Sequence, residues 1–61
     1  MKKTAWIRIN DLKEIEKNMF FEHYKNNENV VLLHNIGNVE YKITNIDDEN
    51  IYLESTGKIY K

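Results

Sequence analysis

The sequence predicts a small α+β protein with a short N-terminal strand, one amphipathic helix and a three- to four-stranded antiparallel β-meander. Two observations support this prediction. Between residues 11 and 29 the apolar residues recur with the 3.6-residue period of a helix, and after residue 29 they recur with the two-residue period of strands. The chain has 61 residues, which is typical of a single small domain, here residues 1–61.

The N-terminal part is expected to form a strand and then the helix. Residues 4–9 (TAWIRI) favour a strand, because tryptophan and isoleucine are common in strands. Asp11 is expected to cap the helix and to place Glu14 at its third position, close to a capping box. The apolar stripe of this helix is Leu12, Ile15, Met19, Phe20 and Tyr24. The asparagine-rich segment 26–29 should end the helix, since asparagine tolerates the left-handed conformation of a C-cap.

The second half of the chain alternates between short apolar runs and turn residues. Strands are expected at 30–34, 39–46, 51–54 and 58–60. Between them lie a turn at 35–38, an acidic loop at 47–50 and a tight turn at Thr56-Gly57. The last strand is expected at an edge of the sheet, where edge strands tend to pair with another chain.

The register of this meander is ambiguous. With the loops above, the facing pairs would be Ile46 with Ile51, Thr44 with Leu53, and Leu53 with Tyr60. The opposite face would then carry Val39, Tyr41, Ile43, Tyr52 and Ile59. Both faces would be partly apolar, although one helix covers only one of them. A β-bulge that resets the register, curling into a small SH3-like barrel, or a partner on the second face would each resolve this, and we expect curling with a residual apolar patch.

The expected core draws on every element. Disulfides cannot help to hold it, because the chain has no cysteine, so a chain this small needs a compact core, self-association or a partner. The core residues are predicted to be Trp6, Ile9, Leu12, Ile15, Met19, Phe20, Tyr24, Val31, Leu33, Ile43, Ile51 and Leu53.

Few residues suit catalysis or metal binding. The chain has no cysteine, a single serine (Ser55) and two histidines, His23 and His34, neither of which has a further ligand at metal-binding spacing. The acidic loop at 47–49 is too short for a calcium loop. We therefore expect no enzymatic activity, no catalytic residues, no metal and no cofactor.

Charge and hydropathy further limit the partners and the location expected for this chain. The net charge is −1, which provides no general attraction to phosphate. No apolar run approaches the 18 residues that a membrane span needs, so no membrane partner is expected. With no targeting signal and no cysteine, a cytoplasmic location is expected.

The best lead to a function is the mixture of aromatic and basic residues in the strands. The candidate binding residues are Tyr41, Lys42, Tyr52, Lys58, Ile59 and Tyr60. The first functional hypothesis is a non-catalytic protein-binding module, a small regulator or inhibitor of a larger protein or enzyme. The alternative is a nucleic-acid-binding module whose tyrosines stack on single-stranded bases while lysines contact phosphates. A homodimer formed through an edge strand or the open face is a third hypothesis.

Overall fold

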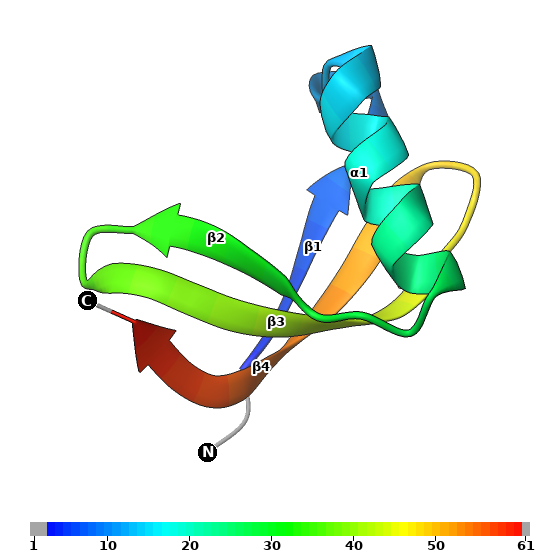
Figure 1. Cartoon of the computed structure of the whole chain (residues 1–61). Helices are drawn as coiled ribbons and strands as arrows, with labels where there is room; N and C mark the ends of the chain where they lie inside the picture. The colour runs from blue at the N-terminus through cyan, green and yellow to red at the C-terminus, as the bar shows by residue number, and fades with distance from the viewer. Residues whose placement is uncertain (1–2, 61) are drawn as a thin grey trace.

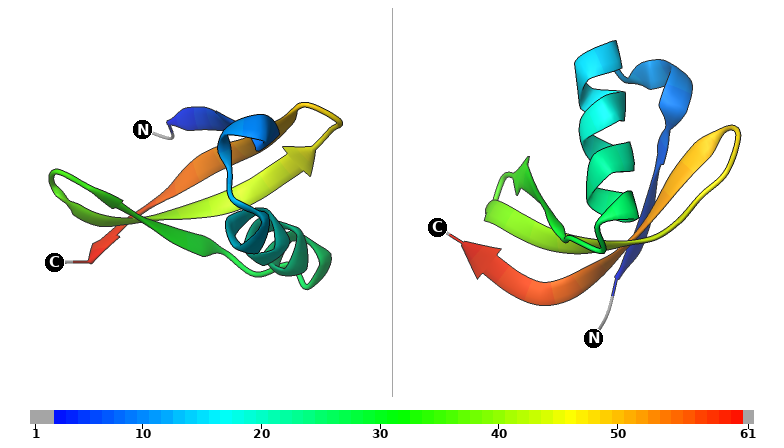
Figure 2. Two further views of the ribbon diagram at one scale, coloured as in Figure 1. Left: turned by 90° about the horizontal axis from the view of Figure 1, so that it is seen from above. Right: turned by 45° about the vertical axis from the view of Figure 1, so that its right-hand side comes forward.

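A computed structural model describes residues 3–60 of the chain (Figure 1). The elements are β1 (Thr4–Arg8), a short 3₁₀ turn η1 (Ile9–Asp11), α1 (Glu14–Lys25), β2 (Val30–His34), β3 (Gly37–Ile46) and β4 (Asn50–Tyr60). The four strands form one antiparallel sheet in the order β1-β4-β3-β2. The sheet curls like half of a barrel and α1 stands on its inner face (Figure 2). The predicted α+β fold with a barrel-like sheet is confirmed.

The helix starts later than the sequence predicts. Asp11 ends η1 instead of capping the helix, and Lys13 is the N-cap. The Lys13 N–H donates to Glu16 Oε1 at 2.9 Å, which ties the first turn together. The capping box predicted at Asp11 and Glu14 is therefore wrong, because the chain forms one 3₁₀ turn before the helix begins. In this turn the Leu12 N–H donates to the Ile9 carbonyl at 3.0 Å.

The helix ends as predicted, in the asparagine-rich segment. Asn27 has a φ of 56°, in the left-handed region. The Glu28 N–H donates to the His23 carbonyl at 2.8 Å, and the Asn27 N–H donates to the Tyr24 carbonyl at 3.2 Å. These two bonds are those of a Schellman motif, which satisfies carbonyls that the helix leaves free.

Two irregularities in the pairing of β3 with β4 settle the register. Ile46 faces Ile51 as predicted, but Leu53 faces Ile43 and not Thr44, because the register shifts between Ile43 and Asn45. This bulge at Thr44 turns the apolar side chains on both sides of it toward the inner face. Val39, Tyr41 and Ile43 therefore share the inner face with Ile51 and Leu53.

The second irregularity shows that the turn predicted at Thr56-Gly57 is wrong. β4 continues through these residues to Tyr60, with a register shift opposite the stretch between Val39 and Tyr41. Gly57 has a φ of 90°, which absorbs the distortion inside the strand. Consequently Leu53 does not face Tyr60, and β4 is not an edge strand. The edges of the sheet are β1 and β2.

The core lies between the inner face of the sheet and one side of α1. Its buried members are Phe20, Val30, Val39, Tyr41, Ile43, Ile51 and Leu53. Ile9 and Leu12 are half-buried against it. Six predicted core residues are instead exposed, namely Trp6, Ile15, Met19, Tyr24, Val31 and Leu33. In β2 the prediction is off by one residue, because Val30 and Leu32 face inward opposite Tyr41 and Val39.

Candidate functional site

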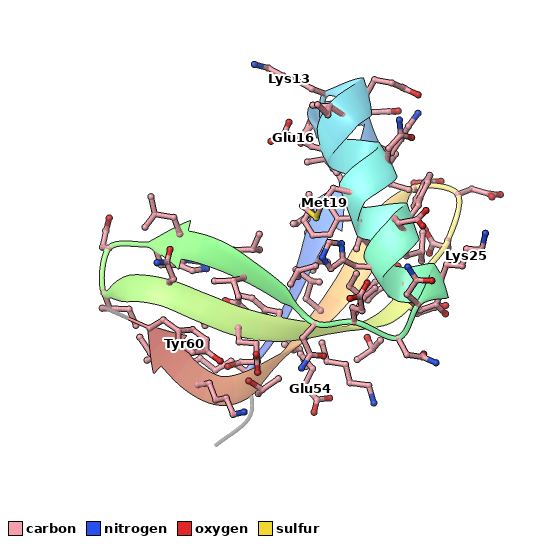
Figure 3. The ribbon with its side chains drawn as sticks, viewed as in Figure 1. Lys13, Glu16, Met19, Lys25, Glu54 and Tyr60 are labelled. Carbon is pink, nitrogen blue, oxygen red and sulfur yellow. The ribbon has the colours of Figure 1, made fainter. Side chains whose placement is uncertain are left out.

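The inner face of the sheet is only partly covered by the helix. Phe20 is the one buried residue of α1, and it belongs to the same cluster as Val30 and Ile43. The hairpin of β2 and β3 reaches away from α1 (Figure 1). Met19 projects from the side of α1 on which this hairpin lies (Figure 3). The inner face toward the tip of the hairpin and the end of β4 is therefore left open.

This open part forms a groove of about 400 Å³, which we call the inner groove. Its lining is Lys3, His34, Ile36, Val39, Tyr41, Ser55, Gly57 and Ile59. Ile36 and Ile59 expose much of their side chains, whereas Val39 and Tyr41 are buried. Among residues 3–60, the lining carries one lysine and no side-chain carboxylate. Such a mostly apolar hollow with a few polar groups is typical of a binding site.

Polar atoms in the inner groove come chiefly from His34 and Tyr41. The Tyr41 hydroxyl and His34 Nε2 lie 3.2 Å apart, and the two rings are tilted by 53° with centroids 5.8 Å apart. Tyr41 is buried in the core, whereas His34 is exposed. The pair therefore offers an ordered polar contact beside apolar walls.

The opposite, outer face holds a cluster around Glu40. Thr56 Oγ1 donates to Glu40 Oε1 at 2.7 Å, and the Tyr60 hydroxyl donates to Glu40 Oε2 at 3.2 Å. The pKa of Glu40 is lowered, chiefly by the hydrogen bond from Thr56. Hydrogen bonds from Tyr60 and Asn29 and the charge of Lys58 act in the same direction, and desolvation opposes them. A carboxylate therefore stays ionised beside Tyr60 and Lys58.

A second carboxylate lies near the other end of the outer face. Asp47 Oδ1 accepts the backbone N–H groups of Asn50 and Glu49, at 2.7 and 2.9 Å, and Oδ2 accepts the Tyr52 hydroxyl at 2.9 Å. These three bonds, led by that from Asn50, lower the pKa of Asp47. Cross-strand from Tyr52 lies the exposed Trp6, and the two line a shallow hollow with neighbouring strand residues.

The structure divides the six predicted binding residues between the two faces. Tyr41 and Ile59 line the inner groove. Tyr52 and Tyr60 donate to carboxylates on the outer face, and Lys42 lies opposite Glu54. Lys58 is also on this face, where its charge helps to lower the pKa of Glu40. Glu54 and Tyr60 both lie on the side of the sheet away from α1 (Figure 3). Of the five predicted tyrosines and lysines, four thus lie on the outer face among carboxylates, and Tyr41 lies on the inner face.

The residues considered for catalysis or metal binding have local structural contacts. His23 Nδ1 lies 2.8 Å from the Met19 carbonyl, and Ser55 Oγ accepts the Gly57 N–H at 3.2 Å. Within residues 3–60, no three His, Asp or Glu side chains come together as a metal site would require. In the same stretch, no helix has both the length and the apolar composition to cross a membrane.

Sequence reasoning missed Ile36 as a site residue. It lies in the two-residue turn between His34 and Gly37, where polar residues are usual. The signal available in the sequence was an isoleucine at the tip of a hairpin, which favours an apolar contact at that position.

Comparisons with protein-family models, with curated proteins and with solved structures found no match to this chain. The function must therefore be argued from the groove and the surfaces described above.

Proposed function

We propose that this chain is a non-catalytic protein-binding module, a small regulator or inhibitor that acts on a larger protein in the cytoplasm. The observation that carries the proposal is the inner groove, in which Ile36 and Ile59 remain exposed above a buried apolar floor. Exposed apolar surface of this kind is unfavourable in a free protein and is typical of protein contact sites.

The lining of the inner groove indicates the chemistry of the segment it would bind. Ile36, Val39 and Ile59 provide apolar contact area. Within the described part of the chain, Lys3 is the one lysine of the lining and no side-chain carboxylate belongs to it. The best complement is an apolar segment of another protein that carries a carboxylate next to its apolar side chains. His34 and Ser55 add polar contacts that would fix the orientation of this segment.

The outer face supports protein binding over nucleic-acid binding. The tyrosines expected to stack on bases, Tyr52 and Tyr60, each donate to a carboxylate. Asp47 and Glu40 therefore place negative charge where phosphates would have to approach. The nucleic-acid hypothesis remains a prediction that the same experiment tests.

The test compares variants of the groove with a matched control. Ile59→Glu and Ile59→Lys place opposite charges in the groove, and Ile15→Glu places a charge on an equally apolar, exposed helix position outside it. A protein captured from the host cell by the wild type should be lost with both Ile59 variants and kept with Ile15→Glu. Titration with that purified protein should then show tight binding by the wild type and Ile15→Glu and weak or no binding by both Ile59 variants.

Binding of a labelled single-stranded oligonucleotide is measured in parallel. We expect the oligonucleotide not to bind, or to bind equally well to the wild type and to Ile59→Glu. If the oligonucleotide binds with a log–log salt slope of about −0.7 per phosphate, and no captured protein distinguishes the Ile59 variants from Ile15→Glu, protein binding through the groove is wrong.

A further inference from the structure

The edge formed by β2 carries a second inference, which rests on the backbone and the exposed side chains of this strand. β2 is the last strand of the sheet on its side and, within residues 3–60, pairs only with β3. Its sequence, VVLLH, contains no Lys, Arg, Asp, Glu or Pro. Natural proteins usually protect an edge with such residues, because an open edge is a template for pairing with another chain. β1, the other edge, is flanked by Lys3 and ends in Arg8.

The turn of the hairpin determines which backbone groups of β2 are free. His34 and Gly37 face each other across a two-residue turn, so they form a hydrogen-bonded pair. Since bonded and non-bonded pairs alternate along an antiparallel ladder, Leu32 and Val30 also bond to β3. The N–H and C=O groups of Val31 and Leu33 therefore point outward from the sheet.

The side chains of these same two residues are unusually exposed. Leu33 is 81% exposed and Val31 is 50% exposed, and both lie on the outer face. A strand in which the free backbone groups and the exposed apolar side chains belong to the same residues is suited to β-strand addition.

We propose that β2 pairs with β2 of a second copy of this chain, antiparallel and about a two-fold axis at Leu32. The occupant is a second copy because the strand is complementary to itself. The axis places Val31 opposite Leu33 of the second copy, and Leu33 opposite Val31, as two hydrogen-bonded pairs. All four free backbone groups on each strand are then used, and apolar side chains meet on the outer face.

Charge and side-chain direction agree with this register. Leu32 meets Leu32 of the second copy, and Val30 meets His34, so inward-facing residues oppose inward-facing residues. Beyond the strand, Asn29 would lie opposite Asn35 and Glu28 opposite Ile36, so no like charges face each other. The net charge of −1 per chain opposes association only weakly. The product is a continuous eight-stranded sheet.

The first test measures mass against concentration. Sedimentation of the wild type up to about 1 mM should show a species of twice the 7.4 kDa monomer, with Kd within that range. Leu33→Lys should weaken this dimer by about tenfold or more, because it places an ammonium against Val31 of the second copy. Ile15→Lys, at a helix position that is 77% exposed, should leave it unchanged.

The second test fixes the register through a disulfide. The chain has no cysteine, so Leu32→Cys introduces a single thiol. At the two-fold axis the two Cα atoms of residue 32 would be about 4.5 Å apart, within disulfide reach. Leu33→Cys is the control, because its two copies would be offset by two residues, about 7 Å along the strands. Circular dichroism checks that each variant is folded.

The expected result is an oxidised dimer with Leu32→Cys and little with Leu33→Cys. A monomeric mass at every concentration would overturn the proposal. It would also be overturned by a dimer that Leu33→Lys leaves as strong as the wild type, or by equal cross-linking of the two cysteine variants.

Discussion

Replacing Phe20 with alanine should remove most of the stability of this protein. Phe20 is 2% exposed and is the only residue of α1 that is buried in the core. Truncation of a buried phenylalanine to alanine costs about 3–5 kcal/mol. A chain of 61 residues has a total free energy of unfolding of about 3–9 kcal/mol at the usual value per residue. The variant is therefore expected to be largely unfolded or only marginally folded.

The neighbouring residue offers a matched control. Phe21 is 39% exposed, so Phe21→Ala removes the same atoms from the same helix with far less loss of buried area. Its cost should be about 1 kcal/mol or less, partly because alanine favours the helix. Phe20→Leu keeps most of the volume and should cost about 1–2 kcal/mol, so it remains measurable if Phe20→Ala does not fold.

Urea denaturation followed by circular dichroism at the helical signal gives the free energy of unfolding of each variant. The expected ranking of destabilisation is Phe20→Ala, then Phe20→Leu, then Phe21→Ala. If Phe21→Ala is as destabilising as Phe20→Ala, the helix is not anchored by Phe20 and the described core is wrong.

Two further predictions concern the turns and strand irregularities. Gly57→Ala should lower the free energy of unfolding by about 1–2 kcal/mol in urea denaturation, because the φ of Gly57 is 90° although there is space for a Cβ. Gly37→Ala should lower it more, because the φ of Gly37 is 131° and the new Cβ would lie 3.0 Å from the Tyr60 carbonyl oxygen. Equal costs would contradict the close approach of Gly37 to β4. Because the pKa of Asp47 is lowered in the folded state, its contribution to stability is present above the ordinary carboxyl pKa and is lost as the pH falls through the lower, folded value. Urea midpoints measured from about pH 5 to pH 2 should therefore fall less steeply for Asp47→Asn than for the wild type, and parallel profiles would contradict this.

The sequence was sufficient to predict the order of the helix and strands as far as β3, although not the turn η1 or the single long strand β4. The bounds of β2 were predicted correctly, and the asparagine-rich segment ended the helix where expected. These features depend on local chemistry, namely the period of the apolar residues and the tolerance of asparagine for a positive φ.

The face that each residue presents was harder to predict. β2 consists almost entirely of apolar residues, so alternation could not show which of them point inward. The two-residue turn at 35–36 sets the phase, and it brings Val30 and Leu32 inward where Val31 and Leu33 had been expected. The helix stripe was similarly overestimated, since periodicity indicates a side of the helix and not how much of that side the sheet covers.

The prediction of the last strand was limited by a single glycine. Gly57 suggested a tight turn, so residues 58–60 were expected to form a separate strand. In the structure Gly57 is a distortion within β4, and the strand runs on beside β3. Ile59 consequently lies opposite Val39 and lines the inner groove, and Tyr60 on the outer face bonds to Glu40. Among the predicted tyrosines and lysines, Tyr41 lies inward because it alternates with Glu40 and Lys42 along β3.

The two proposed contacts are compatible in one assembly. The two-fold axis of an antiparallel strand pair is perpendicular to the sheet, so both copies present their inner faces on the same side. A dimer formed through β2 would therefore display two inner grooves toward the same partner surface. Because β3 separates Ile59 on β4 from Leu33 on β2, Ile59→Glu should abolish partner binding without changing the dimer. Leu33→Lys should leave binding to each groove intact and remove only the gain in affinity that comes from two linked sites.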